Sequence, residues 1–207
     1  MQTGSRTRSR VARSDRARAT RIRVLDAAVP LFVERGYVET TMADLARAAG
    51  VAVQTLYLSF GSKAAVLEAA LDLVAQDHPF VSPTPSARNG PAVLARHVAV
   101  TATAIERRAP LDAVLRDAAA DPEPAALLAT ARQVALAAHS RAVDEMAEKP
   151  GFTVELSLQR ATDVLAAMLS PETYRLLVVE QGWTTPDWAE WAQRHLMVDL
   201  FPAESRS

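Results

Sequence analysis

The stretch AAGVAVQTLYLSFGSK, residues 48–63, decides how this sequence is interpreted. One glycine, Gly50, separates two short apolar patterns, and a tyrosine, a phenylalanine and a lysine follow within thirteen residues of it. Glycine permits a sharp chain reversal because it adopts positive φ angles without steric cost. Two short helices joined by such a turn form a helix-turn-helix, whose second helix enters the major groove of DNA. The stretch therefore predicts a DNA-binding motif.

The residues before this stretch predict two helices that lead into the motif. Apolar residues spaced by three, four and three indicate a first helix that begins near Ala17 and ends at Gly36. Pro30 lies inside this helix, so we expect a kink there. Thr41 and Asp44 have the spacing of a capping box and predict that the second helix begins here and ends at Gly50.

The recognition helix is expected from about Ala52 to Ser59. Its inward face has apolar anchors available at Val51, Leu56 and Leu58. Its early exposed positions, which would face bases, are Ala52, Val53, Gln54 and Thr55. Tyr57 and Lys63 fall at the edges of the motif, where a duplex backbone would pass. The alternatives are a packed aromatic ring for Tyr57 and a solvated surface lysine for Lys63.

The remaining sequence predicts helices and no strand, so the expected fold is all-α. Ser62 caps a fourth helix that ends near Gln76–His78, and residues 79–91, with four prolines, predict a loop. Further helices are expected over 91–108, 111–120, 123–148, 153–169, 171–181 and 186–200. The first three helices form a DNA-binding domain, and a longer helical bundle follows.

Charge is distributed unevenly along the chain. Residues 1–63 hold ten arginines and Lys63 against five acids, whereas residues 64–207 hold twelve bases against nineteen acids. A basic front and an acidic rear are typical of one part that meets a polyanion and another that does not. Residues 1–15 are rich in arginine and lack apolar periodicity, which predicts a flexible basic arm; a basic tail without a partner is the alternative.

Composition excludes several classes of function. The chain has no cysteine, which excludes disulfides and thiolate chemistry and suits the cytoplasm. No apolar run has transmembrane length, and the N-terminus lacks the apolar segment of a secretory signal. The four histidines are scattered, so we expect no metal site, and no catalytic or cofactor-binding motif appears. We therefore predict a protein that is not an enzyme and needs no cofactor.

Residues 31–71 resemble the DNA-binding region of the TetR family of transcriptional regulators. The features that match are the Gly-Tyr after the first helix, the Thr-Thr before the second, Ala-Gly-Val at the turn, Leu-Tyr, and Phe-x-Ser-Lys. The resemblance implies an N-terminal helix-turn-helix domain, a C-terminal body that binds an effector and dimerises, and repression relieved by a small ligand. It divides the chain into an arm (1–15), a DNA-binding domain (16–62) and an effector-binding and dimerisation domain (63–204).

The same resemblance implies roles for single residues. Thr41 would bond a phosphate at the start of the second helix, Tyr57 and Lys63 would hold the DNA backbone, and residues 52–55 would read bases. Three features depart from the family pattern. Ala52 replaces the usual Ser or Thr cap, Leu58-Ser59 replaces an aromatic or histidine pair, and Pro30 replaces a helix former.

The expected partners are a palindromic DNA operator, a second copy of the chain and an unidentified small molecule. The body lining is mainly Ala, Val and Leu, which favours an apolar or amphipathic ligand. Apolar stripes over 154–169 and 186–200 favour a homodimer, with interior helices of a monomer as the alternative. An architectural DNA binder without a ligand is the competing function, and an enzyme carrying an appended helix-turn-helix is a third.

Overall fold

The computed structural model describes residues 3–76 and 89–202, which form helices and the turns between them, with no strand in those ranges. The predicted all-α fold is confirmed. The chain separates into two compact units. We call Met1–Val74 with Ala113–Ala125 the helix-turn-helix unit, and Ala75–Asp112 with Ala126–Ser207 the helical body. The functional division at residues 15 and 62 stays a prediction. So does the assignment of effector binding to residues 63–204.

Helix α1 spans Thr3–Glu39, longer than the sequence predicted. The structure continues the helix through residues 3–15, where a flexible arm was expected. The physical reason is that this segment contains no proline and includes four arginines, which have high helix propensity. The backbone of α1 is helical through Pro30 and leaves helical geometry at Gly36, with φ 77° and ψ 172°. The predicted end of the helix at Gly36 thus corresponds to a real break in the backbone.

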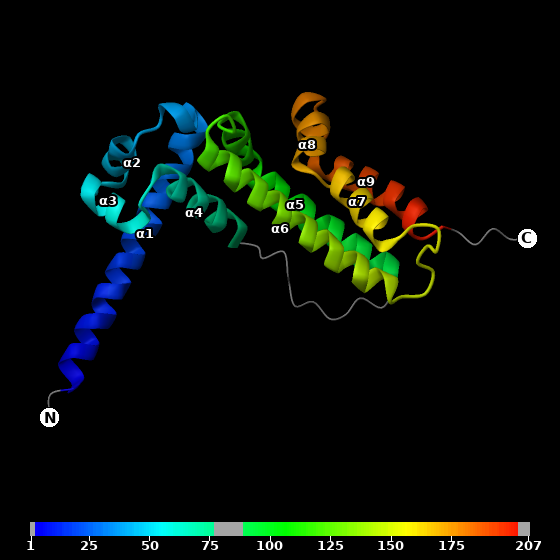
Figure 1. The fold of residues 1–207 in the computed structure, drawn as a ribbon, viewed down its shortest axis with the longest axis horizontal. Coiled ribbons are helices and arrows are strands. Elements are labelled where there is room, and N and C mark those ends of the chain that lie inside the picture. The colour runs from blue at the N-terminus through cyan, green and yellow to red at the C-terminus, as the bar shows by residue number, and fades with distance from the viewer. Residues whose placement is uncertain (1–2, 77–88, 203–207) are drawn as a thin grey trace, which may run out of the picture. The chain divides into compact units, whose positions relative to one another are not determined.

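Three short helices complete the motif: α2 (Met42–Ala49), α3 (Val53–Phe60) and α4 (Lys63–Gln76). Figure 1 shows α2 and α3 as consecutive short helices beside α1. Their core consists of large apolar side chains with almost no exposed surface, namely Phe32, Leu45, Leu56 and Leu67. These residues occupy the inward faces that the helical periodicity indicates, so burial of one stripe per helix holds the unit together.

The helical body begins with α5 (Gly90–Asp117) and α6 (Pro122–Ala147). The predicted break at Ala109-Pro110 is wrong, because α5 runs through Pro110. Pro110 is exposed, so its ring faces solvent and the helix tolerates it. The predicted break at Asp121-Pro122 is confirmed, since α6 begins there. Most of the predicted proline-rich loop, residues 79–88, lies outside the described residues.

The last helices are α7 (Leu158–Met168), α8 (Pro171–Tyr174), a π-helical turn η1 (Arg175–Glu180) and α9 (Thr185–Leu200). Helix α7 starts five residues later than predicted because Ser157 caps it and accepts a hydrogen bond from the Arg160 amide at 3.2 Å. Thr184 and Asp187 form a capping box at the start of α9. None of the helices in residues 3–76 and 89–202 combines the length and apolar character that crossing a bilayer requires.

The stripes expected to form a dimer contribute mainly to the core of the body. Ala161 and Leu165 of α7 and Trp188 of α9 are fully buried, and Trp188 packs edge-on against Tyr174 at 5.1 Å between ring centroids. Only Val154, Leu158, His195 and Val198 of the two stripes are exposed. The homodimer over these segments stays a prediction, as does the alternative of interior helices of a monomer.

Candidate DNA-binding site

The turn between α2 and α3 has the geometry that the sequence predicted. Thr41 is the N-cap of α2, and its hydroxyl accepts a hydrogen bond from the Asp44 amide at 3.1 Å. Gly50 ends α2 in the left-handed conformation, with φ 64° and ψ 38°. The amide of Val51 then donates to the Ala46 carbonyl at 3.0 Å. These local hydrogen bonds fix where α3 begins.

Thr41 is fully engaged in this cap. Its hydroxyl also donates to Oδ2 of Asp44 at 2.5 Å, and its amide donates to the same oxygen at 3.3 Å. These hydrogen bonds from Thr41 lower the pKa of the Asp44 carboxyl. The cap is confirmed, whereas the phosphate contact of Thr41 stays a prediction. Such a contact would require the hydroxyl proton to leave Asp44.

The recognition helix α3 presents its predicted base-facing residues to solvent. Ala52, Val53, Gln54 and Thr55 are all exposed, while Leu56 is fully buried beneath them. The predicted anchor at Leu58 is wrong, because its side chain is 82% exposed. Leu58 lies two residues from Leu56, which is a rotation of about 200° on an α-helix and places it on the opposite face.

Tyr57 lies on the exposed side of α3 with its ring 52% exposed. This exposure argues against the alternative of a packed aromatic ring, and it leaves the hydroxyl accessible to a duplex backbone. Phe60, the last residue of α3, is only partly buried. The guanidinium of Arg21 covers its ring at 4.4 Å from the centroid and donates to the Ser59 carbonyl at 3.3 Å.

Lys63 has partners inside the helix-turn-helix unit. Its ammonium donates to the Tyr37 carbonyl at 2.6 Å and to the Val38 carbonyl at 3.4 Å. It also lies 4.1 Å from the centroid of the Tyr37 ring. Burial lowers the pKa of this amine. These contacts match neither of the two predicted roles of Lys63, a contact to phosphate or a solvated surface lysine. The phosphate contact stays a prediction.

Sequence reasoning did not assign Thr40 and Arg21. Thr40 is fully buried and its hydroxyl donates to the Gly36 carbonyl at 2.7 Å. Thr40 therefore hydrogen-bonds to the end of α1, and Thr41 caps the start of α2. The sequence signal for the first role was a threonine four residues after Gly36, the predicted end of the first helix. The Arg21 contact depends on a ring 39 positions away and has no local signal.

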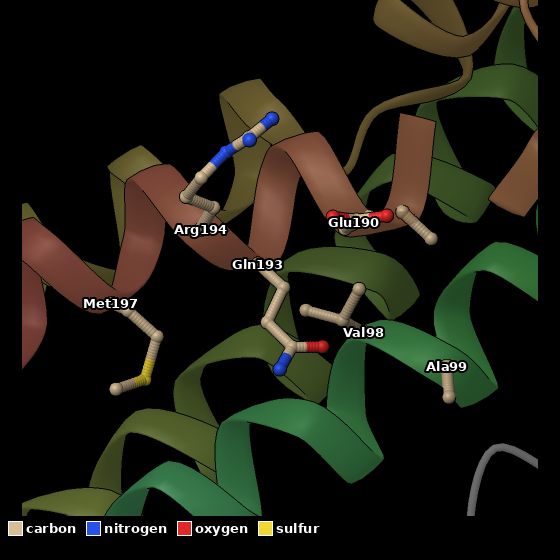
Figure 2. A pocket seen from close by; sticks show the side chains of 7 residues that line it. Val98, Ala99, Glu190, Gln193, Arg194 and Met197 are labelled. Atoms are coloured by element: carbon tan, nitrogen blue, oxygen red, sulfur yellow. The ribbon is translucent and has the colours of Figure 1, made fainter. Parts of the chain in front are cut away.

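The helical body contains an open groove of about 280 Å³ between α5 and α9. Its lining residues are Val98, Ala99, Ala189, Glu190, Gln193, Arg194 and Met197. In Figure 2, Gln193 and Met197 extend from α9 toward α5, whereas Arg194 points away. The lining thus combines apolar side chains with polar ones at the edge.

His97 of α5 and His139 of α6 form a pair in which His139 is buried and His97 is half-buried. Nε2 of His97 lies 2.8 Å from Nδ1 of His139, so one ring donates to the other. Burial lowers the pKa of His97 from its usual 6.5 to about 3 and that of His139 to about 4. Both rings are therefore neutral at physiological pH. No three potential metal ligands come together in the part of the chain that the structure describes.

Comparison with known proteins agrees with this architecture. Residues 24–70 match the family of bacterial regulatory proteins called the tetR family. The chain is 38% identical to the HTH-type transcriptional regulator TtgR of Pseudomonas putida over 64 residues. That match covers 31% of this chain and 30% of TtgR, so the chain spans less than a third of this relative's length in the match.

Two solved structures share the fold over most of the chain. One is a protein of Rhodococcus sp. described as a TetR-family transcriptional regulator, with a TM-score of 0.70 and 19% identity over 87% of this chain and 98% of the other. The second is NalD of Pseudomonas aeruginosa, the secondary repressor of the MexAB-OprM multidrug efflux pump. Its TM-score is 0.66, with 19% identity over 89% of this chain and 98% of NalD.

The fold defines a helix-turn-helix protein with a helical C-terminal body. Its residues 24–70 match the tetR family of bacterial regulatory proteins, and solved proteins described as TetR-family regulators share its fold.

Proposed function

We propose that this protein is a sequence-specific DNA-binding transcriptional regulator that acts as a repressor. The observation that carries the proposal is the surface of α3. Its exposed side presents Gln54 and Thr55, which can hydrogen-bond bases, while Leu56 fixes the helix from below. Caps at Thr41 and Gly50 set where the helix starts. NalD, which shares the fold, is a repressor, and this likeness favours the same direction of control.

The functional form that we propose is a homodimer on a palindromic operator. A two-fold operator requires a two-fold protein, because each half-site is read by one recognition helix. Exposed apolar side chains on η1 and α9, among them Val179 and Val198, are available for pairing two bodies. Of the stripe residues, Val154, Leu158, His195 and Val198 are exposed and available for this contact, whereas Ala161, Leu165 and Trp188 are buried.

An apolar or amphipathic effector is the ligand class that we propose. The groove between α5 and α9 supports this class, because Val98 and Met197 offer apolar surface beside the polar Gln193 and Glu190. Binding there would release DNA only if the ligand prefers a conformation with lower operator affinity. The pair of His97 and His139 shows that the body also accommodates polar groups in its interior.

Selection of DNA from a random duplex pool with the full chain tests the proposal. We expect enrichment of a short two-fold motif and, in a reporter assay, repression from a promoter that carries it. Uniform binding without an enriched motif would support the alternative of an architectural DNA binder. The other alternative is an enzyme with an appended helix-turn-helix. Its signature would be turnover that is independent of DNA binding.

A further inference from the structure

The ammonium of Lys63 contacts Tyr37 and Val38 of its own chain, and these contacts do not depend on DNA. The two carbonyl groups it meets, those of Tyr37 and Val38, directly follow the backbone break of α1 at Gly36. A charge-assisted hydrogen bond to a carbonyl is stronger than a neutral one. The Tyr37 ring beneath the ammonium is 5% exposed and adds a cation–π contact. The ammonium is thus satisfied within the protein.

The position of Lys63 along the chain connects this contact to the recognition helix. Helix α3 ends at Phe60, and Gly61 and Ser62 alone separate it from Lys63. Gly61 donates to the Tyr57 carbonyl at 2.8 Å, and Ser62 accepts from the Ala65 amide at 3.1 Å. This connection has little freedom, so fixing Lys63 also fixes the end of α3.

Helix α3 needs such support because its own packing is small. Of its eight residues, Leu56 is the one that is buried. A single anchor leaves a short helix free to tilt, and base reading depends on its orientation. Arg21 acts on α3 in a similar way, since it covers Phe60 and donates to the Ser59 carbonyl. Two cations of this unit are therefore used in holding helix ends.

We propose that Lys63 is a positioning residue for base recognition: its ammonium binds the Tyr37 and Val38 carbonyls at the end of α1, after the break at Gly36, and thereby sets the orientation of α3. This inference rests on the proposed function. It differs from a phosphate contact in a measurable way. A phosphate contact supports binding to every sequence equally, whereas a misplaced recognition helix loses preference for the correct sequence.

The test compares Lys63→Met with wild type on two duplexes, one recovered by selection with wild-type protein and one with the same bases scrambled. We expect Lys63→Met to lower affinity for the selected duplex about tenfold or more and for the scrambled duplex far less. The slope of log K against log salt should not change. Lys149→Met, which removes the chain's other lysine in the helical body, is the matched control and should behave as wild type.

Lys63→Arg provides a second, independent arm. Arginine keeps the charge and binds phosphate well, but its planar guanidinium does not reproduce a compact ammonium on two carbonyls and a ring. A positioning role predicts that Lys63→Arg also loses preference for the selected duplex. Binding is measured well below each variant's thermal midpoint, so that all protein is folded.

Three results would overturn the inference. Equal loss on both duplexes, with a slope lowered by about 0.9, would show a direct phosphate contact. Wild-type behaviour of Lys63→Arg, or of both variants, would show that the internal contacts do not control recognition. If the wild-type protein enriches no duplex at all, the proposed function fails, and this outcome is separate from the first two.

Discussion

Gln54 is the residue on which we expect the base preference of this protein to depend. It lies in the first turn of α3 and is exposed, and its amide both donates and accepts, which matches N6 and N7 of adenine. Gln54→Ala should cost about 1–3 kcal/mol on the best site and relax preference at one base pair in each half-site. Selection from random duplexes with both proteins measures this, and identical base preferences at every position would show that Gln54 is not a reader.

Gly90 illustrates how one missing methyl group allows close packing in the body. A Cβ at this position would overlap the ring of Phe201, which is itself held edge-on against Phe152. Gly90→Ala should therefore lower the free energy of unfolding by about 1–3 kcal/mol. Chemical denaturation measures the loss. The double variant Gly90→Ala with Phe201→Leu should recover part of it, and purely additive losses would contradict the steric explanation.

Helix α1 contains a proline that its surroundings do not require. Its backbone is helical at Pro30, and the side chain is exposed, so replacement by alanine removes little packing. Alanine restores the amide that proline lacks and relieves the clash with the preceding turn. Pro30→Ala should raise the free energy of unfolding by up to about 3 kcal/mol. Thermal unfolding tests this, and a less stable variant would show that the helix depends on a distortion at this point.

The contact between His97 of α5 and His139 of α6 is expected to make the stability of the protein depend on pH. Because burial lowers the pKa of His97 to about 3 and that of His139 to about 4, the unfolded chain binds protons below pH 6.5 before the folded protein does. The free energy of unfolding should thus change little above about pH 7.5 and fall by about 1 kcal/mol or more per pH unit between about pH 6.5 and 4.5.

Denaturant unfolding at about pH 7.5, 6.5, 5.5 and 4.5 measures the change in the free energy of unfolding, because these pH values lie on both sides of the usual histidine pKa. The double variant His97→Leu with His139→Leu should flatten the curve in this window. His195→Gln, in which an exposed histidine is removed, is the control and should keep the wild-type curve. A slope that persists in the double variant would assign the dependence to other groups.

For the whole molecule, the distribution of charge predicts how the N-terminal segment contributes to binding. Residues 1–23 hold eight arginines and one acid. Deleting residues 1–15 should weaken binding to all DNA and flatten the slope of log K against log salt by about 0.9 for each lost phosphate contact. A salt titration of the truncated protein on the selected and scrambled duplexes checks this. An unchanged slope would show that the segment does not meet DNA.

Local signals predicted the motif because the interactions that form it span few residues. Thr41 and Asp44 are three positions apart, and Gly50 closes α2 through hydrogen bonds to Ala46 and Arg47. Each of these features follows from residue type and spacing alone. The exposed positions of α3 were also predictable, since one buried leucine fixes which face of a helix is inward.

Other features depended on neighbours that are distant in sequence. The ammonium of Lys63 meets carbonyl groups 25 and 26 positions away, and the pairing of His97 with His139 spans 42 positions. A stripe of apolar residues on α7 or α9 looks the same in sequence whether it faces a core or a second subunit. The sequence predicted a helix break at Pro110. Only the tertiary structure shows that α5 continues through Pro110 with the proline exposed to solvent.

The sequence by itself thus determined the helix-turn-helix, its caps and the surface that α3 presents, because backbone hydrogen bonds within a few residues define them. Only the tertiary structure decided which cations are used internally, which apolar stripes are buried and which histidines meet. These outcomes depend on the side chains that folding brings together from separate helices, and no local pattern encodes them.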